Sequence, residues 1–154
     1  MAIKIKDSFI KEDIVDEKGN KIGEIKFNPN DSRIMQKMAE IVNNLYAYLE
    51  ELKSLGDIPE IPENKLESLE EFEEMSETFK TIGKAYDIEE KAADSSINGL
   101  SEIFGKETVE LFTGGTKDVL TLMPLIDYVE PYIKKARNQK VNKYIKKKQN
   151  DVME

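Results

Sequence analysis

The chain contains no cysteine, no histidine and no tryptophan. The absence of cysteine and histidine excludes disulfide bonds, thiol nucleophiles, imidazole bases, Ser-His-Asp triads and zinc sites made from these ligands. The chemistry that remains is that of carboxylates, lysines, hydroxyls and backbone groups. We therefore predict a protein that is not an enzyme, and the sequence indicates no catalytic residue, no cofactor and no metal site.

Long apolar runs are also absent. No stretch approaches the ~20 apolar residues that a membrane-spanning helix needs, and the N-terminus lacks the apolar segment of a secretory signal. Hydrophobic residues make up 39% of the chain and charged residues 35%. A length of 154 residues fits one domain of roughly 100–200 residues. We expect a single cytosolic domain, 1–154, that makes no contact with a membrane.

The formal net charge of -8 is distributed unevenly. Residues 50–77 carry eleven acidic and two basic side chains, whereas residues 134–154 carry eight basic and two acidic ones. Such asymmetry can guide association with a partner or with a second copy of the chain. The alternative is that both segments are solvated helix faces. Nucleic acid is a weaker candidate partner, because the acidic body would repel a polyanion.

The first 30 residues predict a β-hairpin. Ile3, Ile5 and Phe9 alternate with polar residues, and the segment 21–27 alternates again after a polar turn at 16–21 that contains Gly19. Because a lone two-stranded hairpin is marginal in water, we expect it to dock on another element.

Apolar residues spaced three and four apart predict helices over the rest of the chain. The first runs from about 31 to 55, and a second apolar row, Met35, Val42 and Leu49, widens its stripe. A second helix is expected from about residue 64, with a break near Gly83 or Asp87. A short helical turn at 108–112 follows, and then a last helix that Thr116 caps and Pro131 kinks.

These elements predict an α+β, mainly α fold, in which an N-terminal β-hairpin packs on a bundle of three to five helices. Residues 1–30 form the hairpin segment and 31–137 the helical body. Residues 138–154 form a basic tail that frays or awaits a partner.

Three motifs were tested and rejected. The segment 114–117 lacks the glycine spacing of a phosphate-binding loop, so a helix start is expected there. The segment 16–21 lacks the oxygen ligands of a calcium loop. The glutamates of 67–77 lack the histidines that accompany carboxylates in dinuclear metal bundles, so they are expected to form a solvated face.

Two segments of the chain carry a family resemblance. They are 19–27 followed by 28–31, and 97–105 followed by Thr108, Leu111, Phe112, Gly114 and Gly115. In these segments and in its layout the chain resembles small proteins encoded in the tail gene clusters of siphophages and of prophages of Gram-positive bacteria. Those proteins are often described as tail assembly chaperone-like.

The resemblance implies a non-enzymatic role in phage tail assembly in the host cytoplasm, with the tape-measure protein, the tail-tube protein or both as partners. One alternative is a structural component of the tail or neck that stays in the virion. Another is a small nucleic-acid-binding or regulatory protein that uses the basic tail. A homo-oligomer is possible. The candidate partner-binding residues, each of which could equally be ordinary core, are Ile22, Ile25, Phe27, Tyr132, Lys140, Val141, Lys143, Tyr144, Ile145 and Lys147.

Overall fold

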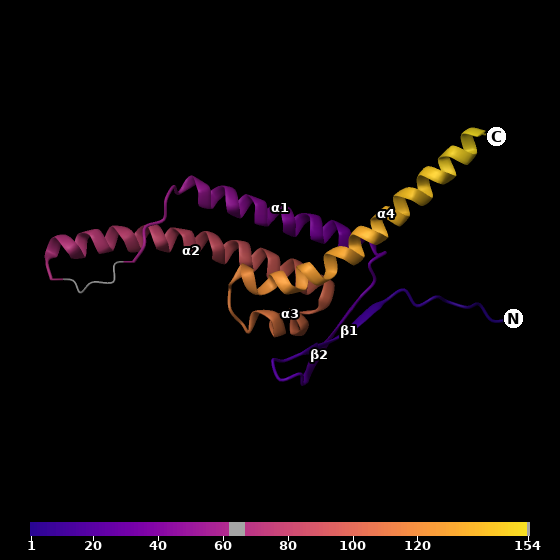
Figure 1. Ribbon diagram of the computed structural model, residues 1–154, viewed down its shortest axis with the longest axis horizontal. Coiled ribbons are helices and arrows are strands. Elements are labelled where there is room, and N and C mark those ends of the chain that lie inside the picture. Colours follow the sequence, from indigo (N-terminus) through magenta and orange to yellow (C-terminus); the bar gives the residue numbers. More distant parts are fainter. Residues whose placement is uncertain (62–66, 154) are drawn as a thin grey trace.

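The computed structural model describes residues 1–61 and 67–153, with side chains in the last helix placed through Ile145. Within these residues the protein is mainly helical and begins with an antiparallel hairpin, which confirms the predicted fold class (Figure 1). The elements are β1 (Ile10–Val15), β2 (Lys21–Phe27), α1 (Ser32–Ser54), α2 (Leu69–Phe104), α3 (Lys106–Thr113), a short 3-10 helix η1 (Val119–Leu122) and α4 (Met123–Met153).

The hairpin turn forms where the sequence predicts it. The Asp16 carboxylate accepts hydrogen bonds from the backbone N–H groups of Lys18 and Asn20, both at 2.9 Å, and Gly19 takes a φ of 85° that favours glycine. Ile14 lies opposite Gly23 and Val15 opposite Lys21, so Ile22 is the extra residue of a bulge.

The first strand begins later than the sequence pattern suggests. Residues 1–9 are not in a strand, and Ile3 and Ile5 are exposed. The reason is the register: Ile10 lies opposite Phe27, the last residue of β2, and the chain then turns at Asn28 and Pro29. Within residues 1–61 and 67–153, no strand pairs with the residues before Ile10.

Helix α1 begins and ends close to the predicted positions. The Asp31 carboxylate accepts the backbone N–H of Arg33 at 3.0 Å and caps its first turn. After the helix, Gly56 takes a φ of 74°, a left-handed conformation that favours glycine.

Helix α2 is continuous from Leu69 to Phe104, so the predicted break near Gly83 or Asp87 is wrong. A glycine inside a helix lowers its stability by about 1 kcal/mol but leaves its hydrogen bonds in place. The Ser68 hydroxyl caps the helix by accepting the backbone N–H of Glu71 at 3.2 Å. The predicted start near residue 64 lies outside the described residues.

Helices α1 and α2 pack antiparallel and in close contact. The Asn44 side-chain amide donates a 2.7 Å hydrogen bond to the Ser95 hydroxyl, and Lys37 forms a 2.7 Å ion pair with Glu102. This pairing places the end of α1 level with about residue 85 of α2, since both helices rise at the same rate per residue. Residues 69–81 of α2 therefore extend past the end of α1, as Figure 1 shows.

Two glycines separate the helices that follow. Gly105, with a φ of 91°, lies between α2 and α3, and Gly114, with a φ of 60°, ends α3. The expected helix start at 114–117 is therefore a helix end. Thr116 is not the cap of the next helix, because its hydroxyl donates to the carbonyl of Thr113 at 2.6 Å. Asp118 caps η1 instead.

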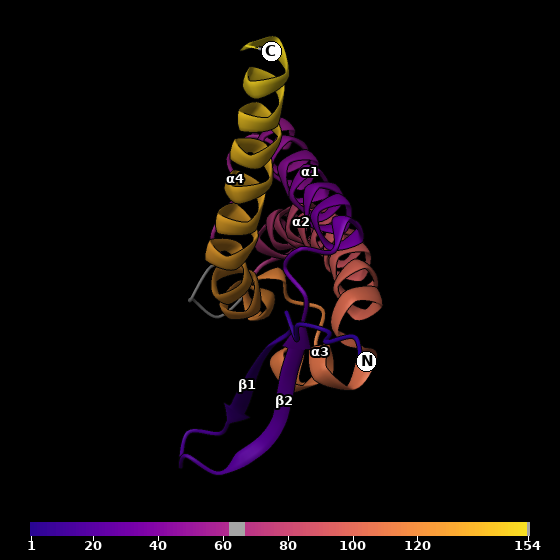
Figure 2. The same cartoon turned by 90° about the vertical axis from the view of Figure 1, so that its right-hand side faces the viewer.

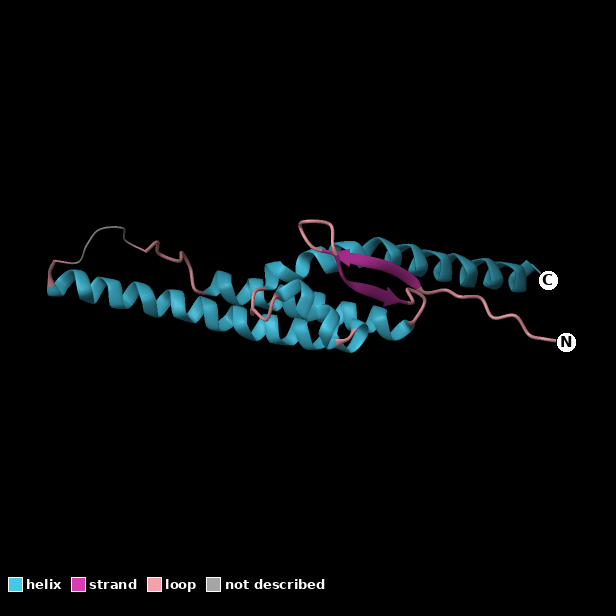
Figure 3. Ribbon diagram, turned by 90° about the horizontal axis from the view of Figure 1, so that it is seen from below, coloured by secondary structure: helices cyan, strands magenta, loops and turns pink. Residues whose placement is uncertain are grey.

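The hydrophobic core lies where the hairpin, α3 and the first turns of α4 meet the paired ends of α1 and α2 (Figures 2 and 3). Phe27 is its centre: its ring makes edge contacts with Phe104, Tyr128 and Tyr132 at centroid distances of 5.6, 6.4 and 5.9 Å. Pro131 lies inside α4, whose later turns leave this core toward the C-terminus in Figure 1. Across the described ranges, no helix is long and apolar enough to span a membrane.

Candidate partner-binding surfaces

The candidate residues of the hairpin fall into two groups. Ile25 and Phe27 are only 3% and 2% exposed and belong to the core, so they are not available on the surface for a partner. They hold the hairpin on the helices, which is the alternative stated for them above. Ile22 points the other way in the bulge and is 45% exposed. Alternation alone did not show which face of the hairpin the helices cover.

Tyr132 is half-buried and contacts Phe27, so it too belongs to the docking of the hairpin. Its neighbour Tyr128 donates a 3.3 Å hydrogen bond to the Glu12 carboxylate of β1. Burial raises the pKa of the Tyr128 hydroxyl, and the hydrogen bond with Tyr132 adds to this shift. Lys140 is also engaged, because its ammonium donates to the backbone carbonyl of Asn30 at 2.5 Å.

The candidates beyond Lys140 lie together on the part of α4 that leaves the core. Val141, Tyr144 and Ile145 are 38%, 71% and 49% exposed, and Lys143 between them is exposed. The Lys147 side chain lies outside the described residues. The structure therefore places Val141, Lys143, Tyr144 and Ile145 together on the projecting part of α4, whereas Tyr132 contacts the hairpin candidate Phe27 in the core.

A groove between α1 and α4 is a surface that the sequence reasoning missed. Its volume is about 430 Å³. The α1 residues Met35 and Val42 supply apolar side chains to it, as do Ile126 and Ile133 of α4, and Lys134 and Arg137 of α4 lie at its rim. The sequence did contain a signal for this surface, namely the second apolar row of α1, Met35, Val42 and Leu49. Met35 and Val42 of this row line the groove, and Leu49 beyond it is 52% exposed.

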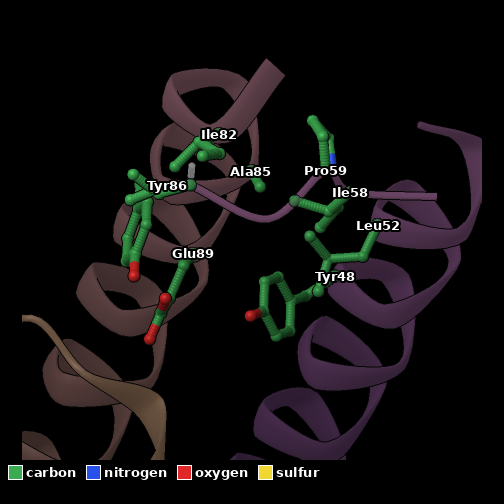
Figure 4. A pocket seen from close by; sticks show the side chains of 9 residues that line it. Tyr48, Leu52, Ile58, Pro59, Ile82, Ala85, Tyr86 and Glu89 are labelled. Atoms are coloured by element: carbon green, nitrogen blue, oxygen red, sulfur yellow. The ribbon is translucent and has the colours of Figure 1, made fainter. Parts of the chain in front are cut away.

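A smaller cleft of about 340 Å³ lies between the C-terminal half of α1 and residues 82–89 of α2. Figure 4 shows Tyr48 of α1 and Glu89 of α2 projecting into it, with Ile58 and Pro59, from the segment that follows α1, above them. Burial raises the pKa of the Tyr48 hydroxyl, and the charge of Glu89 adds to this shift. The walls of the cleft are otherwise mostly apolar.

A third hollow, about 760 Å³, lies between the hairpin and the adjoining ends of α1 and α2. Two ion pairs line it, Lys37 with Glu102 at 2.7 Å and Arg33 with Asp31 at 2.7 Å, while the Lys26 ammonium lies 4.7 Å from the centre of the Phe9 ring. The hydrogen bond to Glu102 raises the pKa of Lys37. The two ion pairs join α1 to α2 and cap α1, so this hollow has a structural explanation.

The N-terminal part of α2 carries a second apolar face that the described residues leave uncovered. Leu69, Phe72 and Phe79 are 76%, 56% and 50% exposed, although they continue the stripe that is buried at Leu100. The glutamates around them form the predicted solvated face. Among the described residues, no group of acidic side chains is arranged to hold a metal ion.

Comparisons of the chain with protein-family models, with curated proteins and with solved structures find no match.

Proposed function

We propose that this protein binds an amphipathic helix of a partner protein and acts, without catalysis, as a chaperone-like factor in phage tail assembly. The observation that supports the proposal is the apolar groove between α1 and α4, whose walls are two helices. An amphipathic helix that lays its apolar face between two such walls is a common mode of recognition.

The chemistry of the groove specifies the bound helix. Met35, Val42, Ile126 and Ile133 favour a partner with an apolar stripe. At the rim, Glu130 forms an ion pair with Lys134 at 3.4 Å, while Arg137 adds a further positive charge. The preferred partner helix therefore carries acidic residues beside its apolar stripe.

The partner we propose is the long helical tape-measure protein of the tail, or the tail-tube protein that assembles on it. This assignment comes from the resemblance of segments 19–31 and 97–115 to tail-cluster proteins. An unassembled tape-measure helix exposes apolar surface, and covering that surface would keep the protein in solution until the tube assembles.

The test is to read the genes beside this one and to co-express the chain with the tape-measure and tail-tube proteins that we expect them to encode. The wild-type chain should raise the soluble yield of one of them and co-elute with it. Val42→Glu should abolish both effects because it places a charge in the apolar groove. Val15→Glu is the matched control, since Val15 is on the hairpin and both valines are 53% exposed.

Two results would contradict the proposal. One is a wild-type chain that changes neither the yield nor the elution of these proteins. The other is a Val42→Glu variant that binds as well as Val15→Glu. Mass spectrometry of purified particles gives a further test, since a chaperone should be missing from them. Its presence there would favour a structural component of the tail or neck.

A further inference from the structure

We propose that the projecting N-terminal part of α2 is a docking site for the projecting C-terminal part of α4 in a second copy of this chain. We call residues 69–81 of α2 the acidic arm and residues 141–153 of α4 the basic arm. The contact joins the acidic arm of one copy to the basic arm of the next. This inference is independent of the proposed function, because the α1–α4 groove includes no residue of either arm.

Each arm carries an apolar face that the rest of the described chain leaves open. On the acidic arm, Leu69, Phe72 and Phe79 follow one another at spacings that place them on one side of the helix, and each is at least half exposed. On the basic arm, Tyr144 and Ile145 lie three and four residues after Val141 and are also exposed. Packing one face against the other would remove both from water.

The charges of the two arms are opposite and nearly equal in number. The acidic arm has five glutamates and one lysine, and the basic arm has four lysines and one aspartate. Two basic arms or two acidic arms would repel each other, whereas one of each attracts. Charge thus selects the pairing of unlike arms over the pairing of like arms.

The arms also match in length. Each has 13 residues, and a helix of this length extends about 20 Å at 1.5 Å per residue. Most helical stability in proteins comes from tertiary packing of an amphipathic face. Because the described chain leaves the apolar face of each arm open, packing against the other arm would stabilise both.

The positions of the arms require that they meet between different copies. In Figure 1 the acidic arm forms one end of the long axis, and the basic arm projects at the other end. A contact between unlike surfaces at opposite ends leaves one free arm of each kind, so it can repeat and build a chain of copies.

The experiment is sedimentation velocity of the full-length protein over a dilution series. At ~50 mM salt, where the Debye length is ~14 Å, the wild type should form dimers and larger species. Near ~1 M salt it should return toward monomer. Changing four glutamates of the acidic arm to lysine should weaken association ~10-fold or more, because both arms are then positive: Glu70→Lys, Glu73→Lys, Glu74→Lys and Glu77→Lys. Changing four lysines of the basic arm to glutamate should do the same, because both arms are then negative: Lys143→Glu, Lys146→Glu, Lys147→Glu and Lys148→Glu.

The eight substitutions combined in one chain should restore association, since the former acidic arm is then positive and the former basic arm negative. The surface control is Lys4→Glu with Lys6→Glu, which should associate as the wild type does. Circular dichroism of every variant should show an intact helical fold. A combined variant that stays monomeric would overturn the inference, as would a wild type that is monomeric at low salt.

A matched pair of leucine substitutions tests the apolar part of the contact. Leu69 and Leu120 are 76% and 75% exposed, and Leu120 lies in η1, outside both arms. Leu69→Ser should weaken association, and Leu120→Ser should leave it unchanged. Equal effects of the two substitutions would exclude the acidic arm as the docking site.

Discussion

The two halves of α2 carry similar apolar spacing and differ in what covers them. In the C-terminal half, Ala93 and Leu100 are fully buried against α1 and the core. In the N-terminal half, Leu69 and Phe72 continue the stripe and are mostly exposed. An amphipathic pattern therefore identifies a helix and its apolar face, but the length of the neighbouring helix decides whether that face is covered within the same chain.

The largest expected effect comes from truncating one phenylalanine in the buried core and one in the exposed acidic arm. Phe27 is 2% exposed and Phe72 is 56% exposed. Phe27→Ala should lower the free energy of unfolding by about 3–5 kcal/mol because it leaves a cavity at the hairpin dock. Phe72→Ala should change it by no more than about 0.5 kcal/mol. Urea denaturation measures both, and similar losses would show that the acidic arm is covered in the monomer.

Two leucines make the same comparison within one helix. Leu100 is fully buried, whereas Leu69 is 76% exposed. Leu100→Ala should cost about 2–5 kcal/mol, and Leu69→Ala should stay within about 0.5 kcal/mol. Both substitutions keep a good helix former, so the difference in urea midpoint isolates packing. A Leu69→Ala loss as large as that of Leu100→Ala would contradict the exposed arm.

Two adjacent serines test the hydrogen bonding in the buried, C-terminal half of α2. Ser96 is fully buried, and its hydroxyl has no hydrogen-bond partner among the described residues. Ser95 accepts a hydrogen bond from Asn44 of α1. Ser96→Ala should stabilise the protein by about 1 kcal/mol, and Ser95→Ala should destabilise it by about as much. Thermal unfolding should show melting temperatures that move in opposite directions, and a drop for both would assign Ser96 an unrecognised partner.

The smallest expected effect is the pH dependence of the α1 cap. Hydrogen bonds from the Arg33 guanidinium and backbone hold the pKa of Asp31 below its usual value of 3.8. Because the folded pKa is lower than the unfolded one, this contribution to stability is present above 3.8 and is lost as pH falls through the folded pKa. Asp31→Asn should remove the contribution at neutral pH, so the difference from wild type should shrink as pH falls below 3.8. An undiminished difference would contradict this.

The sequence was sufficient to predict the elements that depend on local chemistry. The polar turn at 16–21 with Gly19 marked the hairpin turn, and the apolar spacing ended near residue 55, close to the end of α1 at Ser54. The apolar stripe of α1 predicted which side of this helix is buried, and Ile34, Met38 and Ile41 on that side are buried. The register of β1 could not be predicted in this way, because it depends on the end of β2 at Phe27, which lies opposite Ile10. The continuity of α2 past Gly83 was also missed, since a single glycine weakens a helix without ending it.

The candidate surfaces were predicted less well than the fold, for a physical reason. Whether a side chain is exposed depends on which elements pack together. Periodicity placed Ile25 and Phe27 on the same face of β2, but it could not show that α4 covers this face. In the same way, Val42 belonged to a recognised apolar row, but only the position of α4 makes a groove beside it. Among the candidates, Val141, Tyr144 and Ile145 are exposed because α4 runs past every element that could cover them.

The central claim is that the hairpin, α3 and the adjoining parts of α1, α2 and α4 form a stable core, while the two arms at opposite ends of the molecule present open apolar faces that a second copy covers. Amide hydrogen exchange of the full-length protein at low salt tests it most directly. Residues 97–104 and 123–136 should be protected at every protein concentration. Residues 69–81 and 141–153 should exchange rapidly in dilute protein and become protected together as the concentration rises. Arms as protected as the core in dilute protein, or unchanged by concentration, would contradict the claim.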